Sequence, residues 1–142
     1  VASDAHRSAG GFPFDDLKAE RSFVPMLRYG ETKLANILFA RALARRLEGS
    51  GVTANALHPG VVATGFGADS KGVVRLFVRF ARPFLLTPEQ GAETIVHLAA
   101  APEVSGVSGR YFAKSREKSP RAPALDDAAA ERLWTLSESL TG

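Results

Sequence analysis

The sequence predicts an α/β fold, in which helices alternate with short buried strands. Apolar residues recur at helical spacing from about residue 25 to 48, and a short run, Val52 to Leu57, follows them and ends in a Pro-Gly turn. The run is β-branched at its start and suits a buried strand. With 45% hydrophobic and 23% charged residues, the 142 residues are enough for one core.

The chain opens on what we interpret as a strand end, Val1-Ala2-Ser3. Residues from about 4 to 22 are polar and turn-rich and show no sustained period, so we expect a long loop there. The long helix runs from about Pro25 to Glu48, because proline suits a first turn and Gly49 suits a stop. Its apolar positions are Leu27, Leu34, Ile37, Leu38, Leu43 and Leu47.

Two further helices are predicted beyond the Pro-Gly turn. Residues 61 to 71 contain three glycine or serine residues and predict a loop. Val73 to Leu86 is apolar but interrupted by three arginines, which predicts a helix with a basic stripe. The stretch from Thr87 to Ala101 opens on a threonine that can cap a helix, with Pro88 in the first helical position and Gln90 three residues beyond the cap.

A short strand and a last helix complete the predicted order. Gly109 to Lys114 holds an adjacent tyrosine and phenylalanine and predicts a strand, and Ser115 to Ala124 predicts a charged, proline-containing linker. Asp126 and Asp127 lie near the start of the final helix, where the helix dipole favours negative charge. The apolar side of this helix holds Leu133, Trp134, Leu136 and Leu140.

Composition excludes several kinds of function. The absence of cysteine rules out a disulfide framework and a thiolate site and fits a reducing compartment, so we expect a cytoplasmic protein. His6, His58 and His97 are far apart, so no metal site is predicted. The net charge of +3 has no localised patch, so no nucleic-acid partner is expected. No run of 18 apolar residues exists, so no transmembrane segment is predicted.

Tyr29 and Lys33 are the residues most suited to chemistry. They are four apart in the predicted long helix, so both side chains leave it on one face. A lysine ammonium about 4 Å from a phenol favours the phenolate, and a phenol tuned in this way can donate a proton to a carbonyl or accept one from an alcohol. Taken alone, such a pair is more often a surface ring packed over a lysine stem.

Neighbouring motifs make the pair more specific. The run from Tyr29 to Asn36 resembles the Tyr-x-x-x-Lys signature of the short-chain dehydrogenase/reductase family, and Asn55 to Gly60 with Thr64 resembles that family's Pro-Gly turn and downstream threonine. Ala2 to His6 is similar to the end of the strand that carries the family's catalytic serine. The retinol-dehydrogenase-like branch is resembled by three more stretches, Phe14-Asp15-Asp16-Leu17, Glu89-Gln90-Gly91-Ala92 and Gly109-Arg110-Tyr111-Phe112.

The resemblance implies the C-terminal half of a doubly wound, Rossmann-type parallel sheet with flanking helices, as one partial domain that holds the catalytic and substrate-binding residues. It implies a hydrophobic alcohol or carbonyl as substrate and NAD or NADP as cofactor, with NADP slightly favoured. Ser3 would orient the substrate carbonyl, Tyr29 would be the general acid or base, and Lys33 would favour the phenolate and bind the cofactor ribose. The other cofactor contacts would be Pro59, Gly60, Val62 and Thr64.

The family's glycine-rich dinucleotide turn is missing from the sequence. Gly65-Phe66-Gly67 lacks a third glycine at the required offset and does not lie between a strand and the helix that follows it. Since the first residue is valine, we expect a fragment, a processed product or a stand-alone remnant without the N-terminal dinucleotide-binding half. We expect such an isolated chain to bind nicotinamide cofactors negligibly and to be inactive.

Two interpretations of function remain open at this point. The first is an NAD(P)-dependent oxidoreductase in which the basic helix closes over the substrate, although this helix could also lie on an anionic membrane. The second is a non-catalytic interaction module that self-associates through the long helix. A homo-oligomer is expected, because an incomplete sheet would expose an apolar flank and a strand edge. The residues that could line an apolar substrate pocket, or simply pack in a core, are Phe66, Leu76, Phe77 and Phe80.

Overall fold

The structure is a computed structural model that describes residues 1–62 and 85–142. Several predictions concern residues that the structure does not describe. They are residues 73–84 of the predicted basic helix, residues 63–71 of the predicted loop, the four predicted pocket residues and Thr64. The described helices and strands are, in chain order, η1 (Asp4–Ser8), α1 (Pro25–Arg46), β1 (Ala56–His58), α3 (Pro88–Ala100), η3 (Pro102–Val104), β2 (Tyr111–Ala113), β3 (Arg116–Glu117), η4 (Ala122–Leu125) and α4 (Asp127–Thr141), where η denotes a 3₁₀ helix.

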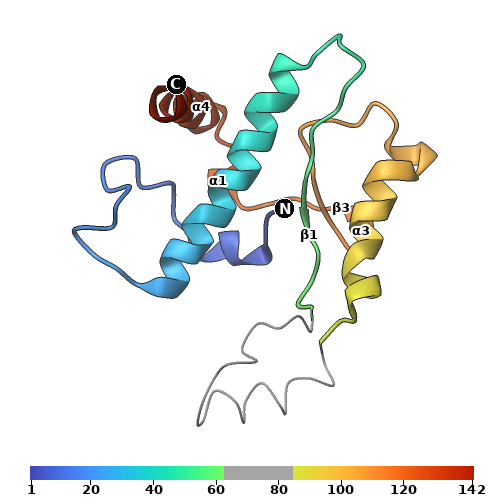
Figure 1. Cartoon of the computed structure of the whole chain (residues 1–142), viewed down its shortest axis with the longest axis horizontal. Coiled ribbons are helices and arrows are strands. Elements are labelled where there is room, and N and C mark those ends of the chain that lie inside the picture. Colours follow the sequence, from blue (N-terminus) through green and yellow to red (C-terminus); the bar gives the residue numbers. More distant parts are fainter. Residues whose placement is uncertain (63–84) are drawn as a thin grey trace.

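The strands form one mixed sheet in the order β1-β2-β3. β1 pairs with β2 in parallel, with Ala56 opposite Tyr111, and β2 pairs with β3 in antiparallel. On the other edge of β1, the Ala2 amide donates a hydrogen bond to the Leu57 carbonyl at 2.7 Å, so the start of the chain runs beside this strand. In Figure 1, α1 and α4 lie on one side of β1 and α3 lies on the other. The prediction of a partial α/β fold is confirmed, with an antiparallel edge strand added to the parallel pair.

Helix α1 is the long helix predicted from the sequence. It starts with Pro25 in its first turn and ends at Arg46, two residues earlier than predicted, before Gly49 takes a φ of 77° that glycine adopts without strain. Leu34, Ile37 and Leu38 are at most 1% exposed and form the centre of the core. The helix therefore buries one apolar stripe and leaves its other face available.

The cap of α3 follows the prediction, and α4 starts at the predicted acidic pair, where Asp126 also acts as the cap. The Thr87 hydroxyl accepts from the Gln90 amide at 3.2 Å, and the Gln90 side chain accepts from the Thr87 amide at 2.9 Å, which completes the expected capping box of α3. In α4 the Asp126 carboxylate accepts from the Ala129 amide at 2.9 Å. These local signals fixed where both helices begin.

Three predicted boundaries were wrong. The strand expected over Val52 to Leu57 is only β1, because the Asn55 side chain bonds the segment before β2 instead, donating to the Val107 carbonyl and accepting from the Arg110 amide. The loop expected over residues 4 to 22 begins with η1, and the linker expected over Ser115 to Ala124 contains β3 and the first residues of η4. β3 pairs with β2 across a two-residue turn, and η1 and η4 each close through backbone bonds to a residue three positions away.

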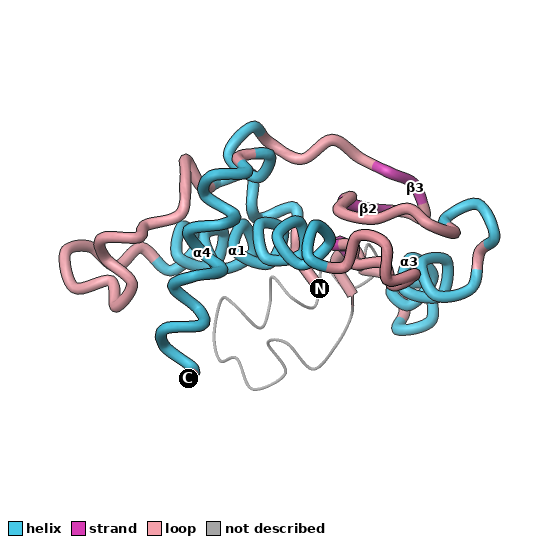
Figure 2. The backbone as a smooth tube through the Cα atoms, turned by 90° about the horizontal axis from the view of Figure 1, so that it is seen from above, coloured by secondary structure: helices cyan, strands magenta, loops and turns pink. Residues whose placement is uncertain are grey.

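The hairpin between β2 and β3 turns through two residues in the left-handed region. Lys114 and Ser115 have φ values of 53° and 54°, as a two-residue type I′ turn requires. Such values are unfavourable for residues other than glycine, asparagine and aspartate. The buried Thr94 hydroxyl in α3 accepts from the Ser115 amide at 3.0 Å and so ties the hairpin to α3. In Figure 2 the hairpin and α3 lie at the same end of the molecule, opposite α1 and α4.

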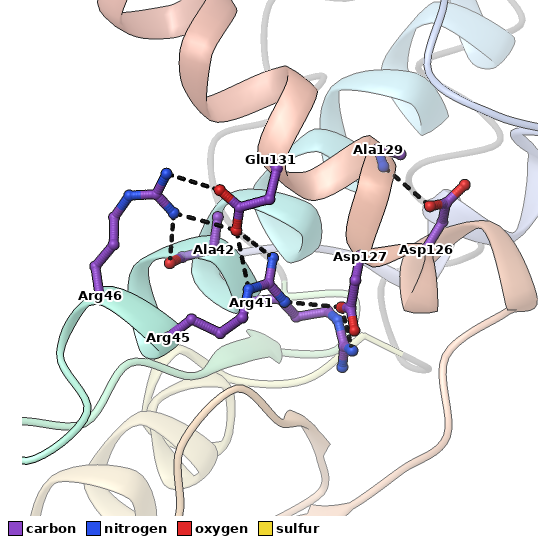
Figure 3. Close-up of polar contacts among 8 residues, drawn as sticks. All are labelled: Arg41, Ala42, Arg45, Arg46, Asp126, Asp127, Ala129 and Glu131. Carbon is purple, nitrogen blue, oxygen red and sulfur yellow. Dashed lines mark hydrogen bonds and ion pairs between the residues drawn. The ribbon is translucent and has the colours of Figure 1, made fainter.

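An arginine cluster, formed by Arg41, Arg45 and Arg46, joins α1 to α4 (Figure 3). Arg45 donates two hydrogen bonds to the Glu131 carboxylate at 2.9 and 2.8 Å, and Arg46 donates to its second oxygen at 2.7 Å. Arg41 donates to Asp127 at 2.7 Å. The hydrogen bonds from Arg46 and Arg45 lower the pKa of Glu131 to about 2. These ion pairs add to the burial of Ala130 and Leu133, which packs the last helix on the helix that carries the predicted catalytic pair.

Candidate active site

Tyr29 and Lys33 lie one turn apart near the start of α1, on a single face of the helix. The Lys33 Nζ atom is 5.3 Å from the centroid of the Tyr29 ring. The tyrosine side chain is 47% exposed, so a ligand could reach its phenol. The helical period therefore places both side chains on one face of α1, with the lysine ammonium over the tyrosine ring.

Ser3 lies at the turn between the segment beside β1 and the 3₁₀ helix η1. Its Oγ atom accepts a hydrogen bond from the Ala5 amide at 3.2 Å, which caps η1 and fixes the hydroxyl oxygen. Because the oxygen acts as the acceptor in this bond, the hydroxyl proton remains free to be donated. A fixed hydroxyl with a free proton is what is needed to orient a carbonyl oxygen.

Gly30 brings the serine segment and the tyrosine together. A Cβ atom at this position would overlap with Ser8 Oγ and would lie 2.6 Å from the Ala5 carbonyl oxygen, both in η1. Only a residue without a side chain lets η1 pack this closely on α1. The Asn36 side chain adds a second link by donating to the Val1 carbonyl at 2.9 Å. The turn that follows Ser3 thus rests on the helical turn that carries Tyr29.

The Pro59-Gly60 turn follows β1 at its carboxyl end, where parallel α/β sheets bind ligands. Gly60 has a φ of 90°, and a Cβ atom there would overlap with the Leu86 side chain. Val62 forms a parallel bridge with Leu86 and packs against Gly91 of α3. The turn is therefore held between β1 and α3.

A cleft of about 670 Å³ opens at the carboxyl ends of β1 and β2. It includes Pro59 and Gly60 but not Ser3, Tyr29 or Lys33. Among the described residues, the predicted cofactor turn and the predicted proton-transfer residues therefore do not share one cleft. The lining comprises Asp4, Arg7, His58, Pro59, Gly60, Leu86, Gln90, Glu93, Thr94, Ala113, Lys114, Ser115 and Lys118.

Sequence reasoning missed Asp4 and its partners. The carboxylate accepts a hydrogen bond from the Tyr111 hydroxyl at 3.0 Å and lies 3.7 Å from His58 Nε2. Burial, with Asp4 beside it, raises the pKa of the Tyr111 phenol, which therefore stays protonated as the donor. A local sequence pattern cannot predict a contact between residues 107 positions apart.

His6 is a structural residue rather than a ligand. It is fully buried, its Nδ1 atom lies 2.7 Å from the Ser3 carbonyl oxygen, and its ring packs edge-on against Tyr111 at 5.1 Å. Burial lowers the pKa of this imidazole. Among residues 1–62 and 85–142, no group of three metal-binding side chains occurs, and none of the helices there is both long and apolar enough to cross a bilayer.

Comparison with known proteins was made over the whole chain. No protein-family model matches it. Human retinol dehydrogenase 14 is 46% identical over all of this chain and 43% of its own length, and mouse retinol dehydrogenase 12 is 40% identical over all of this chain and 44% of its own length. The human WW domain-containing oxidoreductase is 40% identical over 99% of this chain. The chain spans less than half the length of these relatives.

A solved structure supports the fold. An uncharacterised protein from Mycobacterium paratuberculosis superposes with a TM-score of 0.63 at 27% identity, over 99% of this chain and 48% of its own. The described arrangement of helices and strands therefore occurs as part of a larger chain.

Proposed function

Because this chain belongs to the short-chain dehydrogenase/reductase family, in its retinol-dehydrogenase-like branch, we propose that the protein carrying it interconverts a hydrophobic alcohol and its carbonyl with NAD or NADP. One observation carries the proposal. Tyr29 and Lys33 share a face of α1, and Gly30 lets the segment that follows Ser3 pack on the same helical turn. A proton donor, a cation and a second hydroxyl are the groups that carbonyl reduction needs.

Each of the three residues has a distinct role in this proposal. The Tyr29 phenol gives its proton to the carbonyl oxygen as negative charge develops there, and in alcohol oxidation it takes the proton back. The Lys33 ammonium stabilises the phenolate that remains. Ser3 donates its free hydroxyl proton to the same oxygen, while its bond from the Ala5 amide keeps the hydroxyl in place.

The residues after β1 fit a nicotinamide cofactor. Pro59 and Gly60 line the cleft at the carboxyl end of a parallel strand, with Leu86 filling the space where a Gly60 side chain would lie. We propose that Pro59, Gly60 and Val62, together with Thr64, face the nicotinamide, and that Lys33 binds the ribose. When bound, the cofactor supplies or accepts the hydride. NADP is the cofactor that we propose to be preferred.

The names of the relatives suggest the class of substrate. Several of them are named retinol dehydrogenases, so we propose an apolar alcohol or aldehyde of the retinoid kind. We further propose a cytoplasmic protein. Since this sequence has no glycine-rich turn to hold a pyrophosphate, we propose that these 142 residues alone bind the cofactor weakly and have little activity. Micromolar binding of NADPH to this chain alone, measured by fluorescence titration, would contradict that part.

A substitution of one oxygen atom tests the reaction. In the protein that carries this chain, Tyr29→Phe should lower the rate of NADPH-dependent retinal reduction by about 100-fold or more, because only the proton donor is lost. The dissociation constant for NADPH should change little. Retained turnover in this variant would show that Tyr29 is not the proton donor.

A matched pair of lysine variants tests the cation. Lys33→Met should lower turnover because the phenolate loses its nearby positive charge, whereas Lys18→Met removes an exposed lysine from the loop before α1 and should have no effect. Both variants lose the same charge, so equal turnover in the two would show that Lys33 has no specific role.

We also propose that the protein is a homo-oligomer. Phe23 and Met26, at the start of α1, are each 68% exposed, and Val24 between them is 51% exposed. Apolar side chains gathered in this way commonly mark an association surface. Light scattering should detect the oligomer. A stable oligomer of the protein without any nicotinamide binding would favour the alternative function, a non-catalytic interaction module.

A further inference from the structure

We propose that Asp4 is a positioning residue, which holds the serine segment against the strand end that leads into the Pro-Gly turn. The inference rests on the proposed function, because it concerns how Ser3 is placed for the reaction. Asp4 directly follows Ser3, and His58 directly precedes Pro59. A single carboxylate between them therefore connects two parts of the proposed site that lie far apart in the sequence.

The contacts of the carboxylate define this link. Its Oδ1 atom accepts from the Tyr111 hydroxyl at 3.0 Å, and its Oδ2 atom lies 3.7 Å from His58 Nε2. Tyr111 belongs to β2 and is only 2% exposed, so its hydroxyl is a fixed point in the core. Asp4 thus ties the first residue of η1 to β2 on one side and to the end of β1 on the other.

The same segment is held on its other side by the backbone. The Ala2 amide bonds the Leu57 carbonyl, so the chain is fixed to β1 one residue before Ser3 and through Asp4 one residue after it. Ser3 lies between these two anchors. Loss of the Asp4 contact leaves the packing of His6 on Tyr111 as a remaining link between η1 and β2, and an error of about 1 Å in the position of a reacting group can cost ~100-fold in rate.

Among the charged and titratable groups around Asp4, the Tyr111 hydroxyl is the one that mainly fixes the position of the carboxylate. Arg7 in η1 lies 3.5 Å from Oδ1, but both side chains are about half exposed, so this ion pair contributes little. Lys114 and Lys118 line the same cleft, and His6 packs on the Tyr111 ring. Of these neighbours, Tyr111 is the one that is buried and donates a hydrogen bond to the Asp4 carboxylate, so we place the positioning effect on that bond.

A double-mutant cycle tests the link. Asp4→Ala and Tyr111→Phe each remove the bond from one side, and each should lower kcat for retinal reduction by about tenfold while changing KM for NADPH less than twofold. Combined, they should be no worse than either alone, because one bond is lost in all three proteins. The double variant also removes the buried hydroxyl that Asp4→Ala leaves without a partner, which keeps folding from limiting the test.

Two further variants complete the design. Asp4→Asn keeps an acceptor for Tyr111 and should recover kcat to within threefold of the unmodified protein, an effect that a charge-dependent role would not produce. Asp15→Ala removes an exposed carboxylate from the following loop and should leave kcat unchanged. Multiplied effects in the double variant, or full kcat in Asp4→Ala, would overturn the inference.

The proposed function and this inference fail in different ways. If Tyr29→Phe stays active, the reaction assigned to the site is wrong. If Tyr29→Phe is inactive but Asp4→Ala and Tyr111→Phe keep the unmodified kcat, only the role of Asp4 is wrong. Hydrogen exchange gives a readout without turnover, because the Ala5 amide is bonded to Ser3 Oγ and should exchange several-fold faster in Asp4→Ala. Unchanged exchange would overturn the positioning role on its own.

Discussion

Gly91 in α3 faces Val62 so closely that no side chain fits between them, and this contact allows a sharp test of the packing around the Pro-Gly turn. A Cβ atom at Gly91 would overlap with Val62 Cγ2 and would lie 3.3 Å from Cγ1 and 3.5 Å from Cβ. Rotation of the valine offers little relief, because a β-branched side chain has few accessible rotamers and a second methyl group is also close. Gly91→Ala therefore has to displace α3 or the backbone after the turn.

Two effects of opposite sign set the expected free energy. Alanine in place of glycine inside a helix adds about 1 kcal/mol of stability through backbone entropy. Forcing an extra methyl group into a filled space typically costs about 1 to 3 kcal/mol. The overlap with Val62 Cγ2 places Gly91→Ala well inside the second range, so we expect a net loss of about 0 to 2 kcal/mol in the free energy of unfolding.

Removing the obstacle should reverse the sign. In a Val62→Ala background both Cγ atoms are gone, and Gly91→Ala should then raise the free energy of unfolding by about 1 kcal/mol, as helix propensity predicts. Urea unfolding of the four proteins, followed by circular dichroism, gives the coupling energy, which we expect to be about 1 to 3 kcal/mol. Equal effects of Gly91→Ala in the two backgrounds would refute the close contact between α3 and the turn.

Two predictions concern pH. The pKa of Glu131 lies near 2, below its unfolded value of about 4.3, so the stability that it contributes is present above pH ~4 and is lost as the pH falls toward 2. In a plot of the unfolding midpoint against pH, Glu131→Gln should therefore reduce the slope on the acid side. An unchanged slope would contradict this prediction. His6 is buried and its pKa is lowered, so at mildly acidic pH the unfolded chain binds a proton at this residue that the folded chain does not. The free energy of unfolding should therefore fall as the pH drops through and below about 6.5, and His6→Asn should weaken this dependence in the same assay. An identical pH dependence in the variant would refute the prediction.

Local signals in the sequence predicted the elements that depend on neighbours in the chain. The period of α1, the capping box of α3 and the acidic start of α4 are confirmed because each involves residues within a few positions of one another. The proximity of Tyr29 and Lys33 follows from the same helical period.

Contacts between distant segments could not be predicted in the same way. The strand before the Pro-Gly turn is shorter than predicted, and the Asn55 side chain beside it bonds the backbone of Val107 and Arg110. The packing of η1 on Gly30 and the bond from Tyr111 to Asp4 join segments separated by loops and helices. A sequence pattern carries no signal for such pairs, whereas the resemblance to a family pointed to Ser3 despite its distance from Tyr29.

The arginine cluster on α1 makes the last helix more than a cover for the core. Arg41 and Arg45 are four residues apart and would repel each other if Asp127 and Glu131 were not between them. A chain that stopped before Asp126 would leave three uncompensated positive charges on the last turns of α1 and would uncover the apolar stripe beside them. Premature termination before Asp126 should therefore destabilise the core beneath the helix that presents Tyr29, because Ala130 and Leu133 would be lost from it.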